Sequence, residues 1–165
     1  MKTIEIKWEG PLTLDEVESK KSDIDFGLYM AFGRHTLYGD HTLLYVGKAE
    51  QQTFGVRILQ HLNEDWWGNE IIYLGRIGSE INMTKENFKF WDEQIDYAET
   101  MFIKFCLPSW NSSKLNTNNK KYSFDNAIII NDGQLTRATP RVLCDWLFEK
   151  SSFKQKSWKP YSNKI

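Results

Sequence analysis

Residues 26–49, with the sequence FGLYMAFGRHTLYGDHTLLYVGKA, are the starting point for predicting the architecture. Two segments within it, residues 26–34 and 41–48, are rich in the aromatic and β-branched residues that favour strands. Between them, Tyr38-Gly39-Asp40 supplies the residue types of a tight turn. The pattern predicts an antiparallel hairpin whose strands carry the short motifs Gly27-Leu28-Tyr29 and Tyr45-Val46-Gly47.

The residues before the hairpin predict one strand and one short helix. Residues 3–8 place Ile4, Ile6 and Trp8 at a period of two, which is typical of a strand with one buried face. Thr13 and Glu16 then have the spacing of a capping box, and the helix that they begin should reach about Lys20.

A second helix is predicted directly after the hairpin. Thr53 is a candidate N-cap, and apolar residues recur behind it at helical spacing: Phe54, Ile58, Leu59 and Leu62. Arg57 and His61 are four residues apart, so a helix would place both on one face.

The rest of the chain alternates between strand and helix patterns. Residues 70–77 predict a strand with Ile71, Tyr73 and Ile77 on one side, and residues 85–107 predict a long helix that Pro108 ends. One stripe of that helix is apolar: Phe88, Trp91, Ile95, Phe102 and Cys106. Residues 127–130 predict a short strand, Asn131-Asp132-Gly133 a turn, and Thr139-Pro140 the start of a last helix to about Lys150.

These elements predict one domain over residues 1–165, of the α/β class and the α+β type. We expect a small, mainly antiparallel central sheet flanked by helices. A chain of 165 residues with 41% hydrophobic residues is long and apolar enough to bury its own core.

Composition narrows the class of protein. No apolar run of 18 residues and no apolar segment near the N-terminus is present, which argues against membrane spanning and secretion. Cys106 and Cys144 lie in apolar surroundings, so we expect free, buried thiols and a reducing cytoplasm. A net charge of -1 argues against a protein that coats nucleic acid, so any such contact needs a local basic patch. Candidate patches are residues 114–121 and the lysine-rich segment 151–165.

The two hairpin motifs resemble the tripeptides that name the GIY-YIG nuclease family, with Leu28 and Val46 in place of isoleucine. Further residues of the pattern follow in the family's order and at roughly its intervals: Arg57, His61, Glu99 and Asn111. The resemblance covers about residues 26–111, with extensions at 1–25 and 112–165. Fifteen residues, 30–44, separate the tripeptides, which is somewhat more than the family usually has, and a longer turn would absorb them.

The resemblance implies a metal-dependent endonuclease, a hydrolase that cuts phosphodiester bonds in nucleic acid. Glu99 would hold Mg²⁺ or Mn²⁺ at a one-metal site, a carboxylate being a suitable ligand for these hard cations. Arg57 would contact two phosphate oxygens, and Tyr29 and Tyr45 would position and deprotonate the attacking water. A free tyrosine has a pKa near 10, so a neighbouring cation such as Lys48 or His61 would have to favour its phenolate. Tyr29, Lys48 and His61 therefore all remain candidates for the general base.

Each of these residues also has a purely structural interpretation. The two tyrosines could be half-buried packing residues, and Arg57 could pair with Glu64 or Asp65 at the surface. Glu99 could be a solvated helix residue beside Lys104, and Asn111 could close a turn after Pro108. The joint pattern favours function, because all these coincidences would be needed together.

The expected partner is double-stranded DNA, cut in the manner of the restriction enzymes that this family includes. A homodimer would fit double-strand cleavage at a palindrome, although no residue pattern indicates one. The rival interpretation is a non-catalytic module that keeps the fold and binds nucleic acid or protein. The set of polar residues argues against this rival, and the acidity of the chain argues for it.

Overall fold

The computed structural model of the chain describes residues 3–62, 69–78, 88–111 and 127–144. The elements in chain order are β1 (Thr3–Leu12), α1 (Leu14–Glu18), β2 (Gly27–His35), β3 (Gly39–Ala49), α2 (Phe54–Leu62), β4 (Ile71–Gly78), α3 (Phe88–Cys106), β5 (Ile128–Gly133) and β6 (Val142–Cys144). Both lysine-rich candidate patches, residues 114–121 and 151–165, lie outside the described residues.

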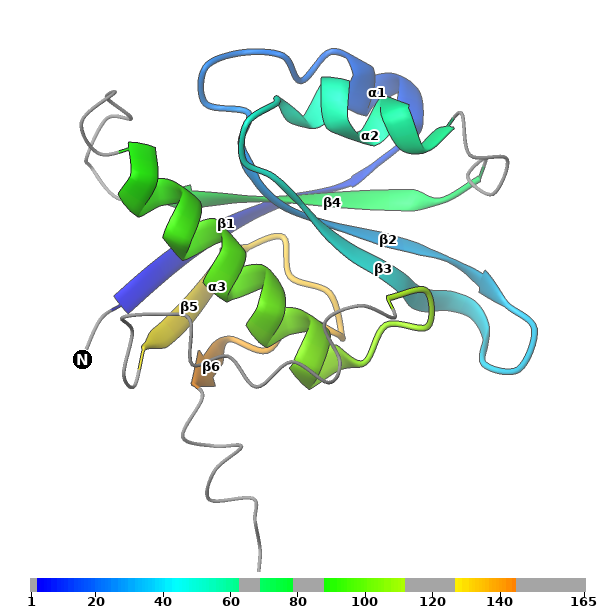
Figure 1. The fold of residues 1–165 in the computed structure, drawn as a ribbon. Helices are drawn as coiled ribbons and strands as arrows, with labels where there is room; N and C mark the ends of the chain where they lie inside the picture. Colours follow the sequence, from blue (N-terminus) through cyan, green and yellow to red (C-terminus); the bar gives the residue numbers. More distant parts are fainter. Residues whose placement is uncertain (1–2, 63–68, 79–87, 112–126, 145–165) are drawn as a thin grey trace, which may run out of the picture.

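The described strands form one mixed, mostly antiparallel, curled sheet in the order β3-β2-β4-β1-β5-β6. Neighbouring strands run antiparallel except for β1 and β5, which pair in parallel. The hairpin β2–β3 therefore lies at one end of the sheet, with β3 as the edge strand (Figure 1). This arrangement confirms an α+β fold with a mainly antiparallel sheet and helices on its faces.

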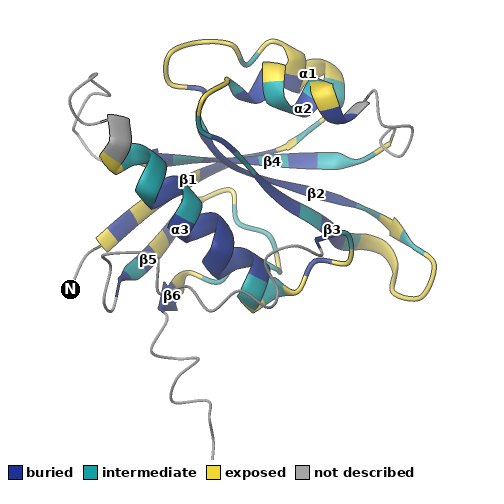
Figure 2. Ribbon diagram, in the orientation of Figure 1, coloured by how far each residue is buried: buried dark blue, intermediate teal, exposed yellow. Residues whose placement is uncertain are grey.

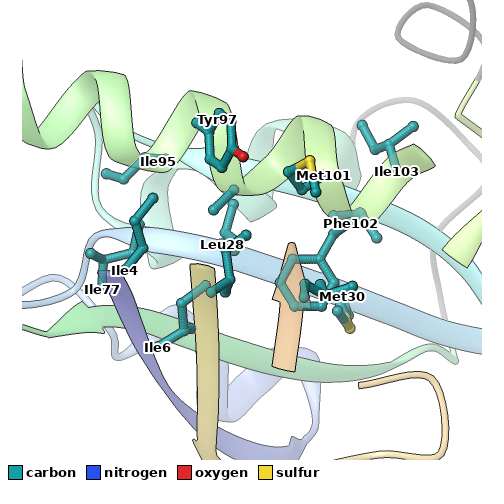
Figure 3. Packing of buried hydrophobic residues seen from close by; sticks show 14 of the residues in the cluster. Ile4, Ile6, Leu28, Met30, Ile77, Ile95, Tyr97, Met101, Phe102 and Ile103 are labelled. Carbon is teal, nitrogen blue, oxygen red and sulfur yellow. The ribbon is translucent and has the colours of Figure 1, made fainter. Parts of the chain in front are cut away.

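The alternation of side chains along β2 separates two hydrophobic clusters. Leu28 and Met30 point to the cluster that α3 covers, where Ile95 and Phe102 pack over the sheet (Figure 3). Tyr29 and Ala31 point to the opposite cluster. The helices α1 and α2 lie over that second face, and both faces are largely buried at the centre of the sheet (Figures 1 and 2). The period of two thus assigns Tyr29 to the face of α2.

The predicted N-terminal caps of α1 and α2 differ in how they agree with the structure. The capping box before α1 is confirmed: Thr13 Oγ1 accepts from the Glu16 amide at 3.4 Å, and Glu16 Oε2 accepts from the Thr13 amide at 2.7 Å. Thr53 does take the predicted N-cap position before α2, but it gives no side-chain cap. Its backbone carbonyl accepts from the Arg57 amide at 2.9 Å, but its buried hydroxyl has no hydrogen-bond partner among the described residues.

Three further details of the sequence pattern are wrong. The hairpin turn lies at residues 36–38, so Gly39 and Asp40 already belong to β3. The tripeptide Asn131-Asp132-Gly133 continues β5, because Asn131 Oδ1 accepts from the Trp8 indole at 2.9 Å and the three residues pair with β1. The predicted helix after Pro140 begins instead as strand β6, which pairs with the outer edge of β5.

The two cysteines are free, as expected. Cys144 is buried, while Cys106 is partly exposed and donates through Sγ to the Ala138 carbonyl at 3.1 Å. Burial raises the pKa of the Cys106 thiol to about 12. Among the described residues, no helix has the length and apolarity that crossing a membrane requires.

Candidate active site

Tyr29 and His61 form the centre of the candidate site. Tyr29 is fully buried on β2, and its hydroxyl lies 2.9 Å from Nε2 of His61 on α2. His61 is itself buried, so this hydrogen bond is shielded from solvent. A protonated phenol donates to an imidazole nitrogen that carries no proton, which means that Nδ1 of His61 would hold the ring proton.

Tyr45 completes an aromatic group of three rings around this hydrogen bond. Its ring centroid lies 6.0 Å from that of Tyr29 and 5.5 Å from that of His61, the latter in an edge-to-face arrangement. A purely structural role predicted that Tyr29 would be a half-buried packing residue. The side chain is instead completely enclosed, and its hydroxyl is paired with His61. The hairpin and α2 together bring the three residues to one point.

Steric contacts explain why each tripeptide has a glycine at its position. Gly47 lies opposite Tyr29 across the hairpin, and a Cβ on Gly47 would lie 2.4 Å from the Tyr29 hydroxyl oxygen. Gly27 has a φ of +140°, and a Cβ there would lie 2.2 Å from the Gly75 carbonyl oxygen of β4. One glycine therefore makes room for the tyrosine side chain, and the other allows β4 to approach β2 closely.

The charges of Arg57 and Glu99 both act on the Tyr29 hydroxyl. Burial is the largest influence and raises the pKa of Tyr29 well above its usual value, and Tyr45 and the Glu99 carboxylate raise it further. Arg57 acts in the opposite direction and lowers the pKa of Tyr29. Since the net direction is upward, Tyr29 is a neutral phenol at neutral pH. Glu99 on α3 is only 6% exposed, so it is not the solvated residue of the structural alternative.

Lys48 lies near the end of β3, and its charge is engaged. Its Nζ is 2.5 Å from Glu50 Oε2 and 2.8 Å from Asp96 Oδ1 on α3. Burial would lower the pKa of Lys48, but the hydrogen bonds to Asp96 and Glu50 outweigh it and raise the pKa. An ammonium held by two carboxylates is a poor proton acceptor, which removes the reason to choose Lys48 as the base.

Asn111 holds the second tripeptide from outside the sheet. Its side-chain amide makes two hydrogen bonds of 2.8 Å with the backbone of Val46, one to the amide and one to the carbonyl. The Trp110 amide donates to the Leu44 carbonyl at 2.8 Å. Residues 110 and 111 thus bond to the edge of β3 as a neighbouring strand would. They fix Leu44 and Val46, and Tyr45 lies between these two residues. Asn111 is therefore a positioning residue in this arrangement.

Besides Glu50, which binds Lys48, two polar residues that the sequence pattern did not single out contact the predicted ones. Gln60 Oε1 accepts from Arg57 Nη1 at 3.1 Å, and Asp96 binds Lys48. Gln60 follows Arg57 by three residues, and Asp96 precedes Glu99 by three. Helical spacing from the predicted residues could have identified both.

A divalent cation at this site would have Glu99 as its protein ligand. Among the described residues, no group of three or more His, Cys, Asp or Glu side chains is arranged to hold a metal ion. A single buried carboxylate fits Mg²⁺, which retains several waters and takes one or two carboxylates from the protein. The donor set is thus suited to a hydrated ion rather than to a closed cage.

We compared the chain with protein-family models, curated proteins and solved structures, and none of them matches it. The functional interpretation therefore rests on the identity of these residues and on the geometry that brings them together.

Proposed function

We propose that this chain is a divalent-cation-dependent endonuclease of the GIY-YIG type that hydrolyses phosphodiester bonds in DNA. The observation that carries the proposal is the buried hydrogen bond of 2.9 Å between Tyr29 and His61. It joins the first tripeptide on β2 to α2, and the ring of Tyr45, from the second tripeptide, lies beside both residues. A buried tyrosine bonded to a histidine can pass a proton, which is what the general-base role needs.

Hydrolysis of a phosphodiester needs a water, a proton acceptor, and positive charge near the phosphoryl oxygens. Because the pKa of Tyr29 is raised, the hydroxyl is better suited to pass a proton than to exist as a phenolate. Because the Tyr29 hydroxyl is enclosed, the proposed step requires the bound substrate to admit the attacking water to it. The water oxygen then bonds to phosphorus, and one water proton moves to the Tyr29 oxygen. Tyr29 gives its own proton to Nε2 of His61, and the bond from phosphorus to the leaving oxygen breaks.

The other residues of the site assist this step. Arg57 would hold two phosphate oxygens through its planar guanidinium, and Gln60 would fix the orientation of that group. Tyr45 would help to position the water, and Asn111 would hold Tyr45 through the backbone on either side of it. A hydrated Mg²⁺ or Mn²⁺ bound by Glu99 would supply positive charge to the leaving oxygen.

Incubation of the pure protein with supercoiled plasmid, with Mg²⁺ or with EDTA, tests the proposal. We expect nicking or linearisation with Mg²⁺ and none with EDTA. Binding of DNA without cleavage under every divalent cation would support the rival interpretation, a non-catalytic binding module.

Substitution of Arg57 tests whether the cleavage belongs to this site. Arg57→Lys should reduce the rate nearly as much as Arg57→Ala, because an ammonium cannot make the planar two-point contact with phosphate. Loss of about 10²-fold or more is expected for both variants, measured in single-turnover assays. Full activity of the lysine variant would mean that Arg57 provides only general positive charge.

A further inference from the structure

A polar cavity of about 210 Å³ opens beside Arg57, between the end of β3 and α2. Its lining residues come from three consecutive segments, the end of β3, the following loop and α2: Lys48, Ala49, Glu50, Gln51, Gln52, Arg57 and Gln60. Gln51, Gln52 and Gln60 are exposed, so their carboxamides are accessible to a ligand. The mechanism above gives no role to the two loop glutamines.

The charges around the cavity nearly cancel. The Lys48 ammonium is bound by the Glu50 and Asp96 carboxylates. Arg57 makes no ion pair with the residues that the structure describes, and it donates to the neutral Gln60 side chain. Arg57 therefore provides the positive charge, while three carboxamides provide both hydrogen-bond donors and acceptors.

This mixture of donors and acceptors favours the edge of a nucleobase over a second phosphate. A phosphate presents only acceptor oxygens, which the Glu50 carboxylate and the amide oxygens would oppose. A base edge presents donors and acceptors side by side, and a carboxamide can pair with the adjacent N6 and N7 of adenine. Arg57 lines the cavity, and His61 of the Tyr29 site follows it by four residues on α2, so a base within the cavity would belong to a nucleotide next to the phosphate that Arg57 holds.

We propose that Gln51 and Gln52, supported by Gln60, read the edge of a nucleobase, preferentially adenine, in the nucleotide adjacent to the cleaved bond. This inference rests on the proposed nuclease activity and adds a determinant of base preference to it. The residues proposed to cleave the phosphodiester bond and those proposed to select the base are therefore different, and Arg57 lies between the two groups.

Sequencing of the ends produced from a randomised double-stranded DNA library, cut with Mg²⁺, tests this inference. The wild type should show adenine enriched at one position beside the cut. The double variant Gln51→Ala/Gln52→Ala should lose this enrichment by about tenfold, a scale typical of one lost two-point base contact. The readout is the distribution of cut sites, so a lower overall rate does not affect it.

Two further variants complete the experiment. Gln51→Glu/Gln52→Glu keeps the size of the side chains but leaves only acceptors, so the preference should move towards cytosine, whose N4 group donates. Asn69→Ala removes an exposed carboxamide that does not line this cavity, and it should retain the wild-type pattern. If the wild type cuts but shows no preference beside the cut, or if the alanine variant keeps it, the base-reading role is wrong and the nuclease activity stands. If the wild type cuts no DNA at all, both proposals fail.

Discussion

Tyr29 differs from an ordinary strand tyrosine because its hydroxyl is both enclosed and paired. The side chain is 0% exposed, and the hydroxyl bonds to His61 at 2.9 Å. Residue identity could predict that Tyr29 belongs to a site, but not that its pKa would be raised. That direction depends on burial, which is set by α1 and α2 packing over the hairpin.

Tyr29→Phe removes this hydroxyl and nothing else. Cleavage should fall by about 10²-fold or more, the scale of a lost proton-transfer group. Stability should fall by about 1–3 kcal/mol, because the buried hydrogen bond between Tyr29 and His61 is lost. Single-turnover cleavage and urea unfolding measure the two effects.

The matched control for this variant is Tyr38→Phe, at the exposed tip of the hairpin, where the tyrosine is 71% exposed. It should cleave and unfold like the wild type. A Tyr29→Phe variant that cuts at the wild-type rate would show that the hydroxyl serves the fold and that His61 receives the proton from water directly.

Gly47→Ala tests the space that the second tripeptide leaves for Tyr29. The new methyl group would lie 2.4 Å from the Tyr29 hydroxyl oxygen and from Cζ, and the Tyr29 ring that it meets is fully buried. We expect a loss of about 1–3 kcal/mol in the free energy of unfolding, together with loss of cleavage.

Gly78→Ala is the comparison for Gly47→Ala, since a Cβ there meets no atom within 4 Å. This variant should unfold at the same or a slightly higher urea concentration than the wild type. Equal stability of the two variants would show that the close approach of Gly47 to Tyr29 has no energetic importance.

At the scale of elements, an ionic network joins the loop before β2 to the sheet. Arg76 of β4 contacts Asp25 at 2.6 Å and Glu9 of β1 at 2.5 Å, and Lys20 contacts Glu9 at 2.6 Å. The backbone of this loop also accepts hydrogen bonds from the first residues of α2, Phe54 and Gly55. The network therefore fixes the start of the hairpin and the start of α2, the two elements that carry Tyr29 and His61.

The stability of this network should depend on acid pH. Burial acts to raise the pKa of Asp25, but the hydrogen bonds from Arg76 and Ser22 outweigh it and lower the pKa. The hydrogen bond from Lys20 is the largest influence on Glu9, whose pKa is also lowered. A carboxylate with a lowered folded-state pKa contributes stability above its unfolded pKa, near 4, and loses it as the pH falls through the folded value.

Asp25→Asn should cost about 1.5–3 kcal/mol at pH 7, because Arg76 loses a charge-assisted hydrogen bond to a buried carboxylate but keeps its contact with Glu9. The difference between this variant and the wild type should shrink as the pH falls below about 4, where the wild-type carboxyl begins to bind a proton. Urea unfolding between pH 7 and pH 3 measures it. Asp23→Asn, two residues away and exposed, should match the wild type throughout. A difference for Asp25→Asn that is constant with pH would contradict the linkage.

The sequence predicted a secondary-structure element correctly where residues close in the chain determine it. Local signals correctly predicted the strand period of β1, the capping box of α1 and four residues of the apolar stripe of α3, Trp91, Ile95, Phe102 and Cys106. Two of the errors involve distant partners, whereas the position of the hairpin turn and the missing side-chain cap of Thr53 are local errors. Asn131 extends because Trp8, far away in sequence, occupies its side chain, and Val142 to Cys144 form a strand because β5 offers an unpaired edge. The site followed the same rule: identities were visible in the motifs, whereas the links from Asn111 to Val46 and from Lys48 to Asp96 join separate elements.

At the scale of the whole molecule, the candidate site is assembled from both sides of the sheet. The hairpin and α2 supply Tyr29, Tyr45, Arg57 and His61, whereas Glu99 comes from α3, which packs on the cluster of the opposite face. The ion pair between Lys48 of β3 and Asp96 of α3 joins the two groups at 2.8 Å. Correct placement of Glu99 therefore requires the complete fold, and this residue gives the strongest test of the proposed mechanism.

Glu99→Gln keeps the size of the side chain and removes the charge that a hard cation needs. Cleavage with Mg²⁺ should fall by about 10³-fold, since charge stabilisation by a metal is worth several kcal/mol in the transition state. DNA binding without metal should persist or improve, because a negative charge that would face the phosphate is gone. Glu93→Gln, on the same helix and partly exposed, should cleave normally. Melting temperatures close to that of the wild type would show that both variants are folded. Normal cleavage by Glu99→Gln, or wild-type cleavage that survives exhaustive chelation, would mean that Glu99 holds no catalytic metal, and the leaving oxygen would then have to be stabilised by Arg57 alone.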